Sequence, residues 1–161
     1  MLRDPSLIPL SHQHHNGLAL CVLIDRALRD DGSAESVAMQ ARRAVERYEI
    51  ELANHFELEE QLLFPAVVGY LGSDPAVSVL IAALIAEHRR FERIVETLRA
   101  GPTAAALTEL SSLLRAHIRR EERELFEDTQ RRLPRETLDW LGAQFEARAV
   151  RVCLQPLRTG G

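Results

Sequence analysis

The sequence predicts an all-α protein: an up-down-up-down four-helix bundle with an additional C-terminal helix. Apolar residues recur at helical spacing over most of the 161 residues. Stretches that contain glycine and proline divide this pattern into four long segments and one shorter segment. Evidence for strands is poor, and the one candidate strand is VRVCL at residues 150–154.

The first two helices are predicted on either side of the turn DDGSAES. Ser11 can cap the first helix, which runs to about Asp31, and Ser33 can cap the second. The second helix is expected to run to Phe64, because Pro65 breaks or kinks a helix.

The next three helices are predicted from caps and breakers further along the chain. After a loose connection, VVGYLGSDP, Asp74 caps a third helix over residues 75–100, which Gly101-Pro102 stops. A fourth helix covers about residues 103–132. Pro134 opens a shorter fifth helix with three apolar residues on one side: Leu138, Leu141 and Phe145.

Length and charge limit the class of protein. A chain of 161 residues fits a single domain, 1–161, with its core at about 8–132 and a C-terminal helix and tail at 133–161. No apolar run approaches the roughly 20 residues of a membrane span, and MLRDPSLIPL does not resemble a signal peptide. We therefore expect a soluble, cytoplasmic protein. The net charge of −4 and the lack of a basic stripe argue against nucleic-acid binding.

Two similar segments carry the residues of chemical interest. HFELEEQLLF starts at His55 and HIRREERELF starts at His117, and both read His-x-x-x-Glu-Glu-x-x-Leu-Phe. In each, the histidine and the first glutamate share a helix face at i and i+4. The repetition suggests paired roles for residues that metals bind.

Each of the four long helices contributes a histidine to its apolar face. His88 lies in the middle of the apolar series of the third helix, and His55 and His117 replace core residues in theirs. On the first helix His14 lies within the apolar stripe. His15, a quarter turn away, is the alternative, and His12 points nearly opposite.

A single inward histidine is more often a satisfied core residue than a ligand, and a His-Glu pair is more often part of a solvated face. Four inward histidines with two inward glutamates are different, because burying carboxylates unpaired is very costly. A cation would remove this cost. The predicted metal ligands are six residues: His14, His55, Glu59, His88, His117 and Glu121. The alternative is a helical protein without a metal.

The ligand types narrow the choice of metal. Imidazole with carboxylate suits iron, manganese or zinc, and the lack of cysteine ligands argues against structural zinc. Cys21 and Cys153 are far apart and form no CxxC motif, so they are interpreted as ordinary thiols. Six ligands fit two metals better than one tetrahedral ion. Two glutamates would bridge, and solvent, an oxo or hydroxo bridge or a small ligand would fill the other positions.

The whole set of motifs resembles the hemerythrin-like (HHE cation-binding) family over about residues 8–130. SHQHHNGLAL resembles the start of small bacterial members. HFELE, the Leu-Phe-Pro that ends at Pro65, the EH at 87–88 and HIRRE then follow in the family's order. The resemblance implies a four-helix bundle with two iron ions, oxo- or hydroxo-bridged when oxidised, ahead of manganese or zinc. It also implies terminal histidine ligands and two bridging carboxylates, Glu59 and Glu121.

The motifs depart from those of the oxygen-carrying hemerythrins of invertebrates, which have a second histidine one turn along the third helix. Glu92 occupies this position in this chain. It is expected either to be a further ligand or to form a salt bridge, with solvent as the ligand instead. The ligand set of four histidines and two glutamates is closer to the hemerythrin domain of iron-sulfur-cluster repair proteins. Glu122, at i+5 from His117, is a reserve ligand. Four glutamates either orient the histidines or belong to a solvated face: Glu57, Glu60, Glu87 and Glu122.

These implications favour a protein that binds or senses O2, NO or peroxide at the metal pair. The alternatives are a di-iron redox enzyme, a protein that supplies iron or repairs iron-sulfur clusters, and iron storage or sensing. No catalytic residue is assigned, no redox partner is identified, and a homodimer is left open. The helix around Trp140 would cover the core or mediate dimer contacts.

Overall fold

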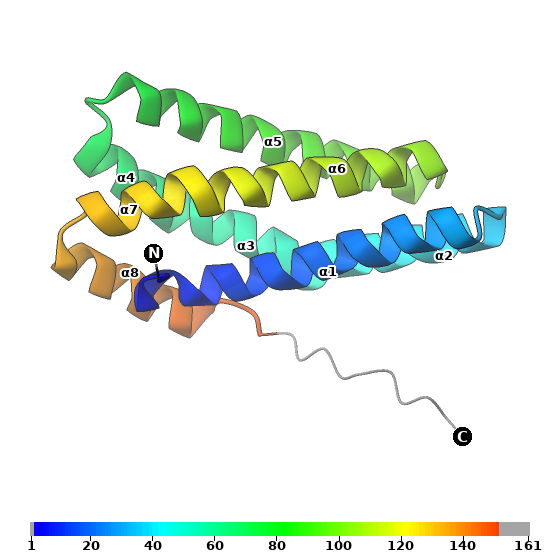
Figure 1. Cartoon of the computed structure of the whole chain (residues 1–161), viewed down its shortest axis with the longest axis horizontal. Coiled ribbons are helices and arrows are strands. Elements are labelled where there is room, and N and C mark those ends of the chain that lie inside the picture. Colours follow the sequence, from blue (N-terminus) through cyan, green and yellow to red (C-terminus); the bar gives the residue numbers. More distant parts are fainter. Residues whose placement is uncertain (1, 152–161) are drawn as a thin grey trace.

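Five helical segments run through residues 2–151, the part of the chain that the computed structural model describes (Figure 1). No strand occurs among these residues, so the predicted all-α class is confirmed. Val150 and Arg151 of the candidate strand belong to no regular element. The rest of that candidate, including Cys153, lies outside the described residues.

Two of the long segments combine α-helices with π-helical turns, in which the backbone hydrogen bond spans five residues instead of four. A 3-10 turn (Pro5–Leu7) precedes the first helix. The elements then follow as α1 (Ile8–Asp30), α2 (Ala34–Arg47), a π turn (Tyr48–Leu52), α3 (Ala53–Leu58), a π turn (Glu59–Leu63), α4 (Phe64–Leu71), α5 (Pro75–Ala100), α6 (Ala104–Arg120), a π turn (Glu121–Leu125), α7 (Phe126–Arg132) and α8 (Arg135–Arg148).

The helix caps agree with the sequence except at the first helix. The side chains of Ser33, Asp74 and Thr103 accept hydrogen bonds from the backbone at the starts of α2, α5 and α6. The prediction that Ser11 caps the first helix is wrong, because Asp4 starts the 3-10 turn that leads directly into α1. Ser11 lies inside the helix, and its hydroxyl donates to Glu122 over 2.7 Å.

The second segment continues past Pro65, contrary to expectation. Proline lacks an N–H and normally clashes with the carbonyl four residues earlier. Here a π turn ends directly before α4, and Pro65 falls in the first turn of α4, where an N–H is not needed. The helix therefore reaches Leu71, and the expected loose connection shrinks to residues 72–74.

The four long segments surround a core that has two apolar parts. Consecutive segments are antiparallel (Figure 1), and α1, α6, α5 and α2 are neighbours around the bundle. One apolar cluster lies toward α4, α7 and α8, and the other lies between α2, the start of α6 and the C-terminal half of α5. The four inward histidines occupy the layer between these clusters, so apolar side chains close the layer from both ends.

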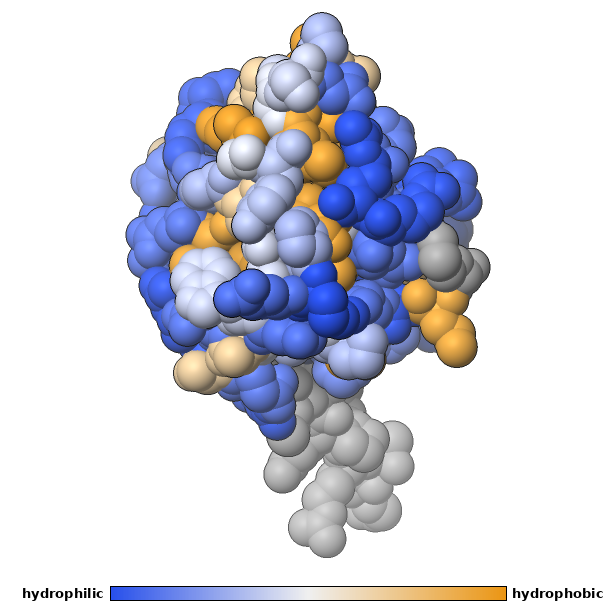
Figure 2. Space-filling model, turned by 90° about the vertical axis from the view of Figure 1, so that its left-hand side faces the viewer, coloured by the Kyte–Doolittle hydropathy of each residue, from blue (hydrophilic) through white to orange (hydrophobic). Residues whose placement is uncertain are grey.

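The C-terminal helix α8 covers one end of the core. The three apolar residues predicted on one side of it are all buried in the first cluster: Leu138, Leu141 and Phe145. Trp140 faces away and is 49% exposed. From the end at which α4, α7 and α8 lie, the surface shows an apolar strip between polar side chains (Figure 2). No helix among the described residues is long and apolar enough to cross a membrane.

Two glycine substitutions are expected to change stability in opposite directions. A Cβ on Gly142 of α8 would lie 2.9 Å from the Cα of Ser6, so Gly142→Ala should force α8 away and cost about 1–3 kcal/mol. A Cβ on Gly69 of α4 meets nothing within 4 Å, so Gly69→Ala should stabilise by about 0.5–1 kcal/mol. Urea unfolding of both variants checks this. A Gly142→Ala protein as stable as the parent would contradict the close packing of α8 on the 3-10 turn.

Candidate metal centre

Six side chains from the four long segments meet in the middle of the bundle. They are the six predicted from the sequence, and each is at most 3% exposed: His14, His55, Glu59, His88, His117 and Glu121. Glu59 and Glu121 each open a π turn, and π turns are frequent at functional sites. The structure thus brings together every residue of the predicted main set.

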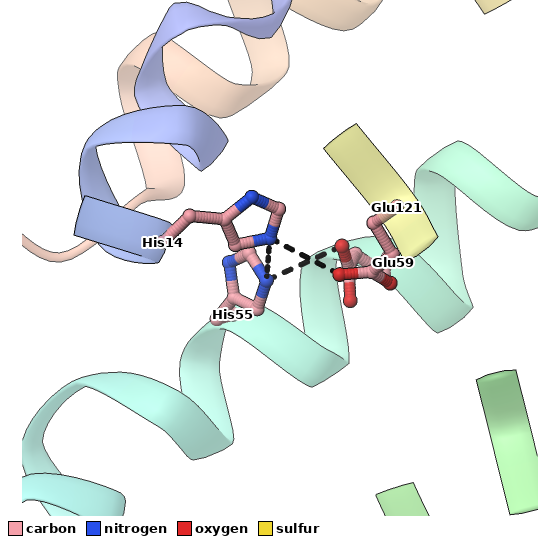
Figure 3. A group of neighbouring side chains, drawn as sticks. All are labelled: His14, His55, Glu59 and Glu121. Carbon is pink, nitrogen blue, oxygen red and sulfur yellow. Dashed lines mark hydrogen bonds and ion pairs between the residues drawn. The ribbon is translucent and has the colours of Figure 1, made fainter. Parts of the chain in front are cut away.

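The first group joins α1 to α3. The Nε2 atoms of His14 and His55, here called pair A, lie 3.0 Å apart (Figure 3). The Nε2 of His55 is 3.2 Å from a carboxylate oxygen of Glu59, and the Nε2 of His14 is 3.1 Å from one of Glu121. Four ligand atoms from three segments therefore face one point.

The second group joins α5 to α6 and uses the same two carboxylates. The Nε2 atoms of His88 and His117, here called pair B, lie 3.2 Å apart. The other oxygen of Glu59 is 3.3 Å from His88, and the other oxygen of Glu121 is 3.1 Å from His117. Each carboxylate thus contacts one histidine of each pair, which is the arrangement expected of two bridging ligands.

The surroundings of Glu59 and Glu121 test whether a cation fits. All four of their oxygens are buried, and none accepts a conventional hydrogen bond within the described residues. Unpaired buried carboxylates are very costly. In each pair two Nε2 atoms also face each other at hydrogen-bond distance, where two lone pairs repel when both rings are neutral. A metal ion in each group would resolve both conflicts, so the residues present fit a pair of cations.

Hydrogen bonds at Nδ1 orient all four imidazoles. The acceptors are Glu122 for His14 (2.7 Å), Gln13 for His55 (2.9 Å), Glu60 for His88 (2.8 Å) and Glu87 for His117 (2.8 Å). Because a carboxylate only accepts, the Nδ1 atoms that face Glu60, Glu87 and Glu122 carry the proton. When the ring is neutral, that tautomer leaves the Nε2 lone pair directed at the centre, as metal ligation requires.

Three arginines balance the outer carboxylates. Glu122 pairs with Arg3 at 2.5 Å, Glu87 pairs with Arg120 at 2.6 Å, and Glu60 pairs with Arg89. The two inner carboxylates have no arginine partner of this kind. The negative charge left without a fixed counter-charge is therefore the charge of Glu59 and Glu121, at the point where the four imidazoles converge.

The carboxylates also shift the pKa values of two histidines. Burial disfavours the charged form of His14, but its contacts with the carboxylates of Glu121 and Glu122 outweigh this effect and raise its pKa from 6.5 to about 9. Burial also opposes the charged form of His117, but attraction to Glu121 dominates and raises that pKa to about 10. Burial disfavours ionisation of Glu122, yet hydrogen bonds from His14 and Ser11 lower its pKa to about 2. The carboxylates that favour a proton on these imidazoles would also favour a metal cation, which must displace that proton to bind.

These shifts predict that the metal-free protein loses stability as the pH rises from about 6.5 to 10. His14 and His117 have raised pKa values when folded, so their contribution is complete below pH 6.5 and is lost as the pH passes about 9 and 10. Metal binding should show the opposite trend, because ligation displaces these protons. Urea unfolding of chelator-treated protein at several pH values checks the first trend. A His14→Gln variant should flatten it, and stability that increases over this range would contradict the assignment.

The reserve residues do not join the centre. His15, the alternative on the first helix, is exposed, as is His12. Glu92 pairs with Arg89 at 2.6 Å, which is the salt bridge considered as its alternative. Glu122 contacts His14 from outside the centre. Of the four glutamates proposed to orient histidines, Glu57 instead accepts from Gln61 at the surface.

Gln13 is the functional candidate that sequence reasoning missed. It is 2% exposed and holds His55 in the place that the sequence suggested for a glutamate. One signal was present: Gln13 directly precedes His14, as Glu87 directly precedes His88. The residue that precedes His14 therefore corresponds to the residue that precedes His88, and this correspondence points to Gln13.

The structure explains why the ten-residue motif occurs twice. In each copy the histidine and the first glutamate face the centre, while the second glutamate, Glu60 or Glu122, holds a histidine on another segment. The final phenylalanine stacks on that same histidine: Phe64 on His88 at 5.8 Å and Phe126 on His14 at 5.1 Å between ring centroids. Each copy therefore supplies two inner residues and two supports for a partner helix.

The fold and the site together define a class: helical bundles that bind cations through histidine and glutamate side chains in their core. A family model described as the hemerythrin HHE cation binding domain matches residues 9–128. The chain therefore belongs to the hemerythrin HHE cation-binding family, as the resemblance of its motifs indicated. No curated protein and no solved structure is similar enough to this chain to count as a match.

Proposed function

We propose that this chain is a non-haem di-iron protein that binds or senses a small diatomic ligand or oxidant, such as O2, NO or peroxide. The observation that supports this most directly is the sharing of two buried carboxylates, Glu59 and Glu121, between two pairs of histidines. One ion would be held by pair A and the other by pair B, with both carboxylates common to the two. Iron held by these residues would supply reversible redox chemistry and could bind a small ligand beside the protein side chains.

The protein side chains determine what can reach the ions. The six proposed ligand residues are at most 3% exposed and lie between two apolar clusters, which supports a small molecule as the ligand. Aromatic rings pack directly against the imidazoles, with Phe56 stacked on His88 at 4.0 Å and Phe126 on His14. A low-polarity surrounding of this kind excludes water and tunes the redox behaviour of a bound metal. This favours a gas or peroxide over a larger substrate.

Metal analysis of protein from iron-supplemented cells, purified without added metal, tests the proposal. We expect about two iron ions per chain, near-UV charge-transfer bands in air, and bleaching of these bands by a reductant. Gas titration of the reduced protein then separates a binding or sensing role from a redox enzyme, which would turn over its ligand. Iron that leaves readily under mild chelation would favour iron supply or storage instead.

Adjacent histidines on the first helix provide a matched control. His14→Ala should lose iron, because it removes one ligand of pair A and the partner of Glu121. His15→Ala, one residue further and exposed, should keep the full iron content. A folded parent protein that takes up no ferrous iron would contradict the metal centre, and preferential binding of manganese or zinc would contradict its assignment as iron.

A further inference from the structure

The centre has an internal two-fold relation that fails at one residue. One half consists of α1 and the second segment, and the other consists of α5 and the fourth segment. His14 and His88 are each held by a glutamate of the opposite half, Glu122 and Glu60. His55 and His117 are each held by a residue of their own half. In both halves this residue directly precedes the other histidine, His14 or His88. That residue is Gln13 in the first half and Glu87 in the second.

The amide of Gln13 both accepts and donates hydrogen bonds here, whereas an ionised carboxylate could only accept them. The Oε1 of Gln13 accepts from His55, while its Nε2 donates to the carbonyl of Val150 and to the Oδ1 of Asn54, both at 3.1 Å. Asn54 in turn accepts from the N–H of Val150 and donates to the carbonyl of Arg148. Gln13 therefore ties the end of α8 to His55, and this tie needs a donor and an acceptor on one side chain.

The equivalent residue in the second half is a charged acceptor. Glu87 lies 2.8 Å from the Nδ1 of His117 and is held by Arg120. Hydrogen bonds to ionised acceptors are roughly twice as strong as those to neutral acceptors. A carboxylate that accepts from a ligating imidazole also makes that imidazole a more basic ligand. Both imidazoles of pair B have such a partner, whereas in pair A only His14 has one.

We propose that Gln13 is a positioning residue that makes the two metal positions inequivalent. Pair B binds the first ion, and pair A binds the second ion more weakly. The proposal rests on the metal pair of the proposed function and adds an order of filling to it. Exchanges of partners that orient metal-bound histidines change metal affinity by about 10–100-fold, so we expect a preference of at least about 10-fold for pair B.

One equivalent of Zn2+ added to the metal-free chain tests the order of filling. Zinc is diamagnetic, so the ring signals of the four histidines can be followed by NMR after assignment with single His→Gln variants. We expect the signals of His88 and His117 to shift first and those of His14 and His55 to shift mainly with the second equivalent. Filling of pair A first, or equal filling of both pairs, would overturn the proposal.

Two variants test whether the preference of the first ion for pair B depends on Gln13. Glu87→Gln gives His117 a neutral acceptor like that of His55, and one equivalent of zinc should then divide about equally between the pairs. Gln13→Met removes the acceptor of His55 at nearly constant volume and should widen the preference at least several-fold. Glu57→Gln, which changes an exposed carboxylate on α3 that contacts no histidine, should leave the order unchanged.

The outcomes separate the two proposals. If the parent protein binds no zinc and no ferrous iron, the metal centre itself fails, and the order of filling fails with it. If two ions bind but Glu87→Gln leaves their distribution as in the parent, the metal centre stands and the role of Gln13 is refuted. If Gln13→Met does not fold, Glu87→Gln still decides the question, because its expected effect does not depend on the tie to α8.

Discussion

Replacement of Glu121 by alanine is expected to remove most of the bound metal from both positions. Glu121 contacts His14 of pair A and His117 of pair B at 3.1 Å each, so its loss would take one oxygen ligand from each of the two proposed ions. Loss of outer-shell partners alone lowers metal affinity by about 10–100-fold, and loss of a shared inner ligand should exceed that. Metal analysis after dialysis, and titration of the metal-free variant with Co2+, measure the effect.

Glu124 offers a matched control for this substitution. It belongs to the same π turn as Glu121 but is exposed. Glu124→Ala should therefore bind metal like the parent protein. If Glu121→Ala lost metal at only one position, the carboxylate would not bridge. If it kept both ions, the proposed ligand set would be wrong.

Replacement of Phe126 by alanine is expected to lower the free energy of unfolding by about 3–5 kcal/mol. Phe126 is fully buried, stacks on His14 at 5.1 Å and lies beneath Arg3, whose guanidinium carbon is 5.2 Å from the ring centroid. Truncation would leave a cavity between the first apolar cluster and the layer of histidines, because the surrounding helices can close the space only partly. Urea unfolding of the metal-free protein measures the change in the free energy of unfolding without a contribution from bound metal.

Two other substitutions show whether this loss comes from the cavity. Phe126→Leu keeps much of the apolar volume and should lose clearly less stability than Phe126→Ala. Val79→Ala on α5 changes a side chain that is 69% exposed and should stay within about 0.5 kcal/mol of the parent. A loss for Phe126→Ala as small as that for Val79→Ala would contradict the packing of the ring on His14.

Phe126 and Glu121 belong to the same copy of the ten-residue motif, so both predictions test the role of that copy. The glutamate would supply ligand atoms to the proposed metals, and the phenylalanine stacks on His14, which comes from another helix. The copy that starts at His55 repeats this with Glu59 and Phe64. A defect in either copy should therefore affect both pairs of histidines.

The sequence by itself determined the approximate positions of the helices and the six residues that converge in the centre. Helical periodicity places each side chain on a face of its own helix to within a fraction of a turn. This was enough to choose His14 over His15 and to select Glu59 and Glu121, because both choices depend on spacing within one helix. The number and types of these residues added the expectation of two metals bridged by the two glutamates, and the structure places the six residues in two groups that share both carboxylates.

Only the tertiary structure decided how the helices continue and which residues support the histidines. Pro65 signals a helix end in isolation, but a preceding π turn lets the helix continue. Spacing along one helix does not say which side chain of another helix lies opposite, because that depends on the axial stagger and rotamers of both. For this reason Glu57 was included among the supports, and Gln13, whose partners are His55 and the end of α8, was overlooked.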